Sequence, residues 1–288
     1  MKKILIVVLV MMLAVCGCAK GPKSDKKETS GTENLPVIDG KSETDVANEE
    51  AVESETVNES EKEPEEKTEE KAVDYAALSG KIIVVDPGHG IASSSRQEPI
   101  APGSSEKKAA FVSGTSGANQ TEEQLNLAVG LKLKAALEEK GAVVHMTRET
   151  HECDVSNVDR AKMANELGAD IAVRIHADGS ENTSAHGVSV LVPGNQYIKN
   201  DELITKSRNA GELVLNAFVN STGAQDRGIS VRNDMTGFNW SEVPVILVEM
   251  GFMSNPEEDR LMETGEYQDK MVKGMVIGLA EYFAGIAE

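Results

Sequence analysis

The segment IIVVDPGHG, residues 82–90, is a short β-branched run that ends in a Pro-Gly turn and a histidine. Two later runs have the same form: residues 171–175 lead into His176, and residues 243–248 lead into Glu249. Short apolar runs bounded by Gly, Pro and Asp are typical of buried strands in a largely parallel sheet. Ligands bind at the carboxyl ends of such strands. Two histidines and a carboxylate at that edge therefore indicate a candidate metal-hydrolase site.

Helix-like patterns alternate with these runs, which predicts an α/β domain with a central, mostly parallel mixed sheet and helices on both faces. Thr121 and Gln124 have the spacing of a capping box, which predicts that a helix begins at residue 122. A long polar loop, residues 90–120, precedes this helix, and loops of that length are usually functional or mobile. Further strands are predicted over residues 142–147 and 187–192, and further helices over residues 156–168 and 201–220, from residue 255, and from residue 266 to the C-terminus.

The first 18 residues have the form of a bacterial lipoprotein signal. Two lysines precede an apolar run that is shorter than a membrane-spanning helix requires. Cys18 fits the acylated cysteine better than Cys16, because the small residue Gly17 precedes Cys18 whereas the bulkier Val15 precedes Cys16. The sequence therefore predicts export, lipidation at Cys18 and anchoring on the outer face of the cytoplasmic membrane, facing the cell wall. An ordinary signal peptide or an uncleaved anchor is the alternative.

Residues 19–75 are predicted to be a disordered acidic linker. Residues 19–74 hold 18 acidic and 8 basic side chains and few large apolar ones, so they cannot bury enough surface to offset the entropy of ordering. The remaining domain, residues 76–288, carries a net charge of −11, because the signal adds +2 and the linker −10 to the chain total of −19. It shows no basic stripe, which argues against nucleic acid and against electrostatic membrane binding. Cys153 has no partner there, so no disulfide framework is expected.

The residue types permit a zinc site. A catalytic zinc takes three protein ligands and leaves one position open for water. His89 and His176 are candidate donors. Glu122, in the first turn of the predicted helix, is either the third ligand or a partner for the helix dipole. Glu249 is either the third ligand, a general base or a buried hydrogen-bonding group. The spacing alone leaves these alternatives open.

Four blocks of the domain stand out together: VVDPGHG at 84–90, EEQLNLAVGLKL at 122–133, IHADGS at 175–180 and PVILVEMGFMSNPEED at 244–259. In this order they resemble the zinc-dependent N-acetylmuramoyl-L-alanine amidases, the peptidoglycan amidases of bacterial cell walls. The resemblance implies one zinc ion per domain, held by His89, Glu122 and His176, and a catalytic glutamate at Glu249. It places the ligand on Glu122 and not on the neighbouring Glu123.

The resemblance also implies a reaction, the hydrolysis of the amide bond between N-acetylmuramic acid and the first L-alanine of the stem peptide. Zinc would activate a water molecule, and Glu249 would take a proton from that water and pass it to the departing amine. Arg227, in an Asp-Arg-Gly segment, is a candidate for orienting the substrate, with a surface salt bridge as the alternative. Ile91 and Asp178 depart from the residues common in the family, which bears on substrate detail and not on the reaction.

Other functions remain open at this stage. The same fold and metal set would serve a zinc peptidase that cuts within the stem peptide, or a non-catalytic wall-binding lipoprotein, although candidates at all four chemical positions argue against the second. A substrate-binding lipoprotein of a transporter would show two similar lobes, which the sequence lacks. The expected partners are peptidoglycan and, through the lipid, the membrane. The domain is expected to be monomeric, and the sequence does not show whether a protein partner activates it.

Overall fold

The computed structural model describes residues 72–92 and 94–286. The predicted signal peptide, Cys18 and nearly all of the predicted linker lie outside these residues. Within the described ranges, no helix combines the length and the apolar character that crossing a membrane requires.

Six strands form one mixed sheet in the order β4-β1-β5-β8-β6-β7. Strands β4, β1, β5 and β8 are mutually parallel, β6 is antiparallel to β8, and β7 is parallel to β6. The predicted central sheet, mixed and mostly parallel, is therefore confirmed. The strands are β1 (Ile82–Pro87), β4 (Val143–Met146), β5 (Ile171–Asp178), β6 (Val188–Pro193), β7 (Asp226–Arg232) and β8 (Val245–Phe252).

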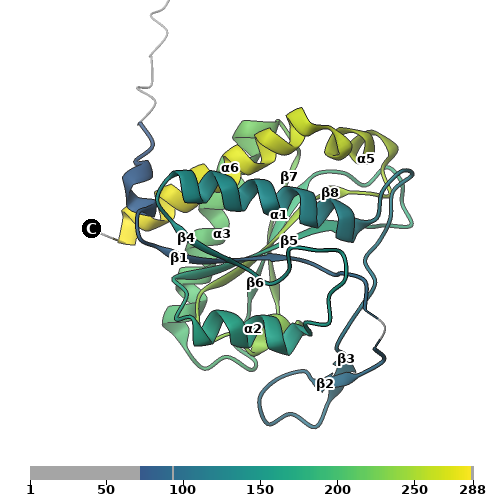
Figure 1. Ribbon diagram of the computed structural model, residues 1–288, viewed down its shortest axis with the longest axis vertical. Helices are drawn as coiled ribbons and strands as arrows, with labels where there is room; N and C mark the ends of the chain where they lie inside the picture. Colours follow the sequence, from purple (N-terminus) through teal and green to yellow (C-terminus); the bar gives the residue numbers. More distant parts are fainter. Residues whose placement is uncertain (1–71, 93, 287–288) are drawn as a thin grey trace, which may run out of the picture. The chain divides into compact units, whose positions relative to one another are not determined.

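Helices cover both faces of the sheet, as predicted. One face packs against α1 (Glu122–Glu139), α3 (Asp201–Thr222) and α6 (Gly265–Ile286), which share the larger apolar core with the strands. The other face packs against α2 (Asn157–Glu166) and α4 (Thr236–Asn239) through a smaller core. Figure 1 shows α1 and α6 on one side of the sheet and α2 on the other. A 3-10 turn (Tyr75–Leu78) and α5 (Pro256–Glu263) pack against α6.

The predicted helix boundaries follow from local chemistry. The N–H of Thr121 donates to Oε1 of Gln124 over 3.0 Å, which is the glutamine half of the predicted capping box at the start of α1. The same helix ends before Gly141, whose φ of +87° suits glycine. Ser156 caps α2, since its Oγ accepts a hydrogen bond from the N–H of Asp159.

Several short elements were not predicted from the sequence, among them the 3-10 turn and α4. Strand β7, at the edge of the sheet, was not predicted, because its residues are exposed or half-buried and show no apolar alternation. The loop at residues 90–120 contains a small antiparallel hairpin, β2 (Gln97–Pro99) and β3 (Lys107–Ala109). Each of its strands has only three residues, too few for a periodic signal. Figure 1 shows the hairpin projecting from the sheet.

Candidate metal centre

Three side chains from separate parts of the chain converge near the carboxyl ends of β1 and β5. His89 follows β1, Glu122 is the first residue of α1, and His176 lies near the end of β5. The Nε2 atom of His89 is 2.9 Å from Oε1 of Glu122. The Nδ1 atom of His176 is 3.0 Å from the same oxygen and 3.1 Å from Nε2 of His89. Across residues 72–92 and 94–286, this is the one group of His, Cys, Asp or Glu side chains with the spacing of a metal site.

Backbone groups hold two of these side chains in place. The carbonyl of Val112 accepts a hydrogen bond from Nδ1 of His89 over 2.8 Å, so Nδ1 carries the proton and Nε2 presents its lone pair to the cluster. Oε2 of Glu122 accepts from the N–H of Thr115 over 2.9 Å, and Oε1 accepts from the N–H of Ala177 over 3.2 Å. Outer hydrogen bonds of this kind fix the tautomer and the orientation of metal ligands.

The turn after β1 brings the two histidines unusually close. A Cβ atom on Gly88 would lie 2.2 Å from the ring of His176, so only glycine fits at this position. His89 has a φ of +61° and is the one non-glycine residue with a positive φ in the described ranges. Such a conformation costs about 1–3 kcal/mol and persists where the surrounding structure enforces it. The DPGHG turn therefore fixes His89 in a strained conformation at the cluster.

The cluster fits a zinc ion. Tetrahedral zinc, with bonds of about 2.0–2.1 Å, separates its ligand atoms by about 3.3 Å, so the donor atoms need to move apart by only a few tenths of an ångström. Burial lowers the pKa of His176 to about 4, which keeps its ring neutral and available to a metal at neutral pH. Burial alone would raise the pKa of Glu122, but hydrogen bonds with His176 and His89 outweigh it and hold that pKa well below its usual range.

Glu249 lies next to the cluster on the neighbouring strand. It is the register partner of His176, so the two residues sit side by side on parallel strands β5 and β8. Its Oε2 atom is buried and has no hydrogen-bond partner among the described residues. Burial, together with the negative charges of Glu122 and Asp178, raises the pKa of Glu249 to about 8. A cation at the cluster would act in the opposite direction by favouring the carboxylate. Such a carboxyl is suited to accepting and returning a proton.

A buried carboxylate in β1 anchors a network of charged side chains next to the site. Asp86 is 2% exposed and pairs with two arginines, Arg160 through Oδ1 and Arg174 through Oδ2, the latter over 2.7 Å. Thr147 donates a further hydrogen bond to Oδ1 over 2.5 Å. Burial would raise the pKa of Asp86, but the charges of Arg160 and Arg174 outweigh it and hold that pKa far below its usual range. No role for this network was predicted from the sequence.

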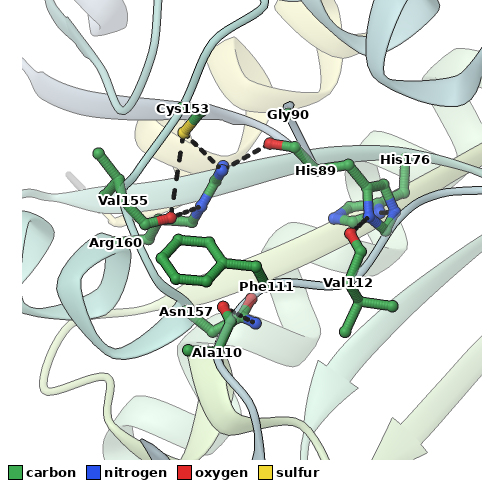
Figure 2. A pocket seen from close by; sticks show the side chains of 10 residues that line it. All are labelled: His89, Gly90, Ala110, Phe111, Val112, Cys153, Val155, Asn157, Arg160 and His176. Atoms are coloured by element: carbon green, nitrogen blue, oxygen red, sulfur yellow. Dashed lines mark hydrogen bonds between the residues drawn. The ribbon is translucent and has the colours of Figure 1, made fainter. Parts of the chain in front are cut away.

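The arginines in turn hold the backbone that carries His89. Arg160 donates to the carbonyl of Pro87 over 2.9 Å and to the carbonyl of His89 over 2.6 Å. Arg148 donates to the carbonyl of Gly88 over 2.9 Å. Figure 2 shows the guanidinium of Arg160 next to the carbonyl of His89, while the imidazoles of His89 and His176 lie together on the far side of the turn. The buried ion pairs therefore fix the turn that positions the first candidate ligand.

Replacement of Asp86 is expected to destabilise the fold. Asp86→Asn leaves Arg160 and Arg174 buried without an anion, which should lower the free energy of unfolding by about 3 kcal/mol at pH 7. Because the pKa of Asp86 is depressed in the folded state, its contribution to the free energy of unfolding is complete above the unfolded pKa of about 3.9. This contribution is lost as the pH falls toward the pKa of Asp86 in the folded state. Urea unfolding should therefore show a difference between the two proteins that shrinks progressively below about pH 4.

A matched control for this experiment is Asp269→Asn. Asp269 pairs with Lys132 over 2.6 Å, but its side chain is 72% exposed, so the change should cost less than about 1 kcal/mol. If Asp86→Asn were as mild as Asp269→Asn at pH 7, the buried pairs would not be supporting the turn.

Arg227 lies apart from the cluster. It is an exposed residue at the start of β7, where its guanidinium lies over the ring of Phe252 and donates to the carbonyl of His186 over 3.2 Å. It does not line the pocket that contains Glu249. A role for Arg227 in orienting substrate stays a prediction.

Two large pockets flank the cluster, besides a small one of about 50 Å³ that is also lined by His89 and His176. One, of about 670 Å³, is lined by the three candidate ligands and Glu249 and extends to Arg232 on β7. The other, of about 630 Å³, lies on the other side of His89 and is lined mostly by residues 90–124, including Phe111. The long loop expected to be functional or mobile therefore forms one wall of the site.

Comparison with known sequences identifies relatives of this domain. The sequence profile of a family described as N-acetylmuramoyl-L-alanine amidase (Amidase_3) matches residues 83–281. An N-acetylmuramoyl-L-alanine amidase of Mycobacterium tuberculosis is 32% identical over 217 residues, covering 73% of this chain and 89% of the relative. The germination-specific N-acetylmuramoyl-L-alanine amidase of Bacillus subtilis is 28% identical over 222 residues, covering 72% of this chain and 81% of that protein.

Solved structures give the same result. The N-acetylmuramyl-L-alanine amidase Ami1 from Mycobacterium smegmatis aligns with a TM-score of 0.66 at 28% identity, covering 72% of this chain and 99% of that chain. The catalytic domain of the amidase CwlV from Bacillus (Paenibacillus) polymyxa aligns with a TM-score of 0.57 at 25% identity, covering 71% and 98%. The span of the family profile includes His89, Glu122, His176 and Glu249. The chain thus belongs to the N-acetylmuramoyl-L-alanine amidase family.

Proposed function

We propose that the chain is a zinc-dependent peptidoglycan hydrolase that cuts the amide bond between N-acetylmuramic acid and the L-alanine of the stem peptide. One observation carries this proposal: His89, Glu122 and His176 converge, with Glu249 on the next strand, in a pocket of about 670 Å³. Membership of the amidase family supports the reaction, and the donor set supports the metal.

The three converging side chains are the proposed zinc ligands. His89 through Nε2, His176 through Nδ1 and Glu122 through Oε1 make up the two imidazoles and one carboxylate found in several catalytic zinc sites. When bound, zinc supplies a Lewis acid that polarises the scissile carbonyl and lowers the pKa of water at its open position. The hydrogen bond from Nδ1 of His89 to the carbonyl of Val112 keeps the Nε2 lone pair directed at the proposed metal position.

Glu249 is the proposed proton carrier. Its carboxylate accepts a proton from the attacking water as the new C–O bond forms. The protonated carboxyl then donates to the nitrogen of the departing alanine as the C–N bond breaks, which releases a free amine and a lactyl carboxylate. The buried Oε2 atom, which has no partner in the described ranges, is available for this exchange.

The proposed location follows from the N-terminal residues. Lipidation at Cys18 would anchor the protein on the outer face of the cytoplasmic membrane, and residues 19–75 would form an acidic tether to the wall. Staphylococcal relatives named as probable cell wall amidases support action at the wall. The match covers 60% of the length of these relatives, so this chain shares their matched domain and not their whole architecture.

Digestion of purified peptidoglycan with mass analysis of the products tests this function. We expect free stem peptides that begin with alanine, and glycan strands that retain the lactyl group. A chelator should stop the release, and added zinc should restore it. Shortened peptides still attached to glycan would instead indicate a peptidase, and full activity in a metal-free preparation would exclude zinc.

A further inference from the structure

The pocket that contains Glu249 continues across the face of the sheet. It passes over Leu247 on β8 and Leu191 on β6 and reaches Arg232 and Met235. A second pocket, of about 380 Å³, is also lined by Arg232 and Met235, so the two adjoin at these side chains, and together we call them the trough. Because the strand order is β5-β8-β6-β7, this trough begins at the candidate metal ligands, crosses to the last residue of β7 and continues to Lys108 and Val112 in the loop before α1.

A cluster of two cations and one carboxylate lies at the far end of the trough. Arg232 donates from Nε and Nη2 to the two carboxylate oxygens of Asp234, each over 2.8 Å. Lys108, from the β2–β3 hairpin, donates to the backbone carbonyl of Asp234 over 2.5 Å and lies 3.8 Å from its carboxylate. The cluster therefore has a net charge of +1, in a chain whose net charge is −19.

Part of this positive charge is free to bind a ligand. The side chains of Arg232 and Lys108 are 40% and 41% exposed. Asp234 engages Nε and Nη2 of Arg232, and no described residue accepts a hydrogen bond from Nη1. Asp234 thus holds the guanidinium in place while leaving a donor directed away from the ion pair. A fixed guanidinium donor near an ammonium group is suited to a carboxylate.

The trough is polarised along its length. The end near the metal ligands carries the side chains of Asp178, Glu181 and Glu249, whereas the opposite end carries Arg232 and Lys108 together with Asp234. An anionic group on a bound peptide would therefore be attracted to the second end.

The proposed chemistry decides which half of the substrate enters this trough. Glu249 returns its proton to the departing amine, so the amine, and the peptide that follows it, must lie on the side of Glu249. The acyl half then lies toward the other pocket, which is lined by His89, residues 90–92, 94 and residues 111–124. From β8 over β6 to β7 the trough crosses two strand spacings of about 4.8 Å each. An extended peptide advances at most about 3.3–3.6 Å per residue, so about three residues of the leaving peptide would span this distance.

We infer that Arg232 and Lys108, held by Asp234, bind a carboxylate of the departing stem peptide and so select peptides that keep this carboxylate free. This inference rests on the proposed function and adds a specificity determinant to it. Arg232 is the main contact, because its guanidinium is fixed by the ion pair. Lys108 adds charge, and Asp234 acts as a positioning residue through Arg232.

Paired substrates test this inference. Two muramoyl peptides are compared that differ only in the carboxyl group of the second residue, which is free in one and a carboxamide in the other. The wild-type protein should cleave the free carboxylate with a kcat/KM about tenfold higher, the lower range for a charge-assisted hydrogen bond. Arg232→Gln should reduce this ratio to near one, mainly through KM. Lys108→Gln should reduce it by a smaller factor.

The ratio isolates the contact from other effects. Any influence of Arg232 on the proton transfer by Glu249 alters both substrates and cancels in the ratio. Arg208→Gln is the matched control, since Arg208 pairs with Glu212 on the exposed face of α3, and it should keep the wild-type ratio. Equal cleavage of both substrates by the wild-type protein would overturn the inference, while the proposed amidase function would still hold. A ratio unchanged by Arg232→Gln, or lost in Arg227→Gln instead, would also overturn it. Failure to cleave either substrate at the muramoyl–alanine bond would remove the proposed function and this inference with it.

Discussion

Glu249→Gln is expected to lower kcat on peptidoglycan by about 10²–10⁴-fold while the protein keeps its zinc. The amide has nearly the same shape as the carboxyl group, but at neutral pH it neither accepts a proton from water nor donates one to the leaving amine. Glu249 lies beside the cluster of candidate ligands and not among the converging donor atoms, so its replacement should leave the zinc content unchanged. Turnover by product release and zinc content by elemental analysis are the two measurements.

Each outcome of this experiment decides one of the roles left open for Glu249. Retained turnover would remove Glu249 from the mechanism. Loss of zinc together with activity would show that it is a ligand. Loss of stability with zinc retained would assign it to a buried hydrogen-bonding role. Glu242→Gln is the matched control, because Glu242 is an exposed glutamate in the connection just before β8, and it should behave as the wild-type protein.

Much of the fold follows from short-range patterns in the sequence. The β-branched runs that lead to His89, His176 and Glu249 are strands β1, β5 and β8, and they lie next to one another in the sheet. Because these strands are buried on both faces, their residues form continuous apolar runs, and these runs allowed the strands to be predicted. Edge strand β7 lacks such a run, and its terminal Arg232 therefore escaped notice although it lines the site.

The supporting network of the site was harder to predict. Arginines are usually exposed, so the sequence did not indicate that Arg148 and Arg160 hold the turn after β1. One signal was present. Arg174 interrupts the apolar run of β5, and Asp86 ends the run of β1, and charged residues in buried strands are rarely left unpaired. That pattern predicts a buried ion pair, although not which backbone carbonyls the arginines would hold.

Glu122 is the residue whose local sequence pattern and whose place in the site suggest the most different roles. By position it is an acidic residue in the first turn of α1, where a carboxylate stabilises the helix dipole by about 0.3–1 kcal/mol. By geometry its Oε1 atom lies 2.9 Å and 3.0 Å from the donor nitrogens of His89 and His176. Periodicity cannot separate these roles, because a helix start is favourable for acids whether or not they bind a metal. Only the family resemblance favoured ligation.

Glu122→Gln is therefore expected to lower zinc affinity by more than about 100-fold, since loss of an outer hydrogen-bond partner alone costs 10–100-fold. Activity at limiting zinc should fall with it, and competition with a chromophoric chelator measures the affinity directly. Glu123→Gln is the matched control, because Glu123 occupies the same helical turn but contacts His151 over 2.9 Å. Both variants remove one negative charge from the start of α1. If Glu122 only stabilised the helix dipole, the two variants would have the same zinc affinity and the same modest loss of stability. A large loss of affinity confined to Glu122→Gln requires that Oε1 of Glu122 bind the metal, since the change in helix electrostatics is common to both.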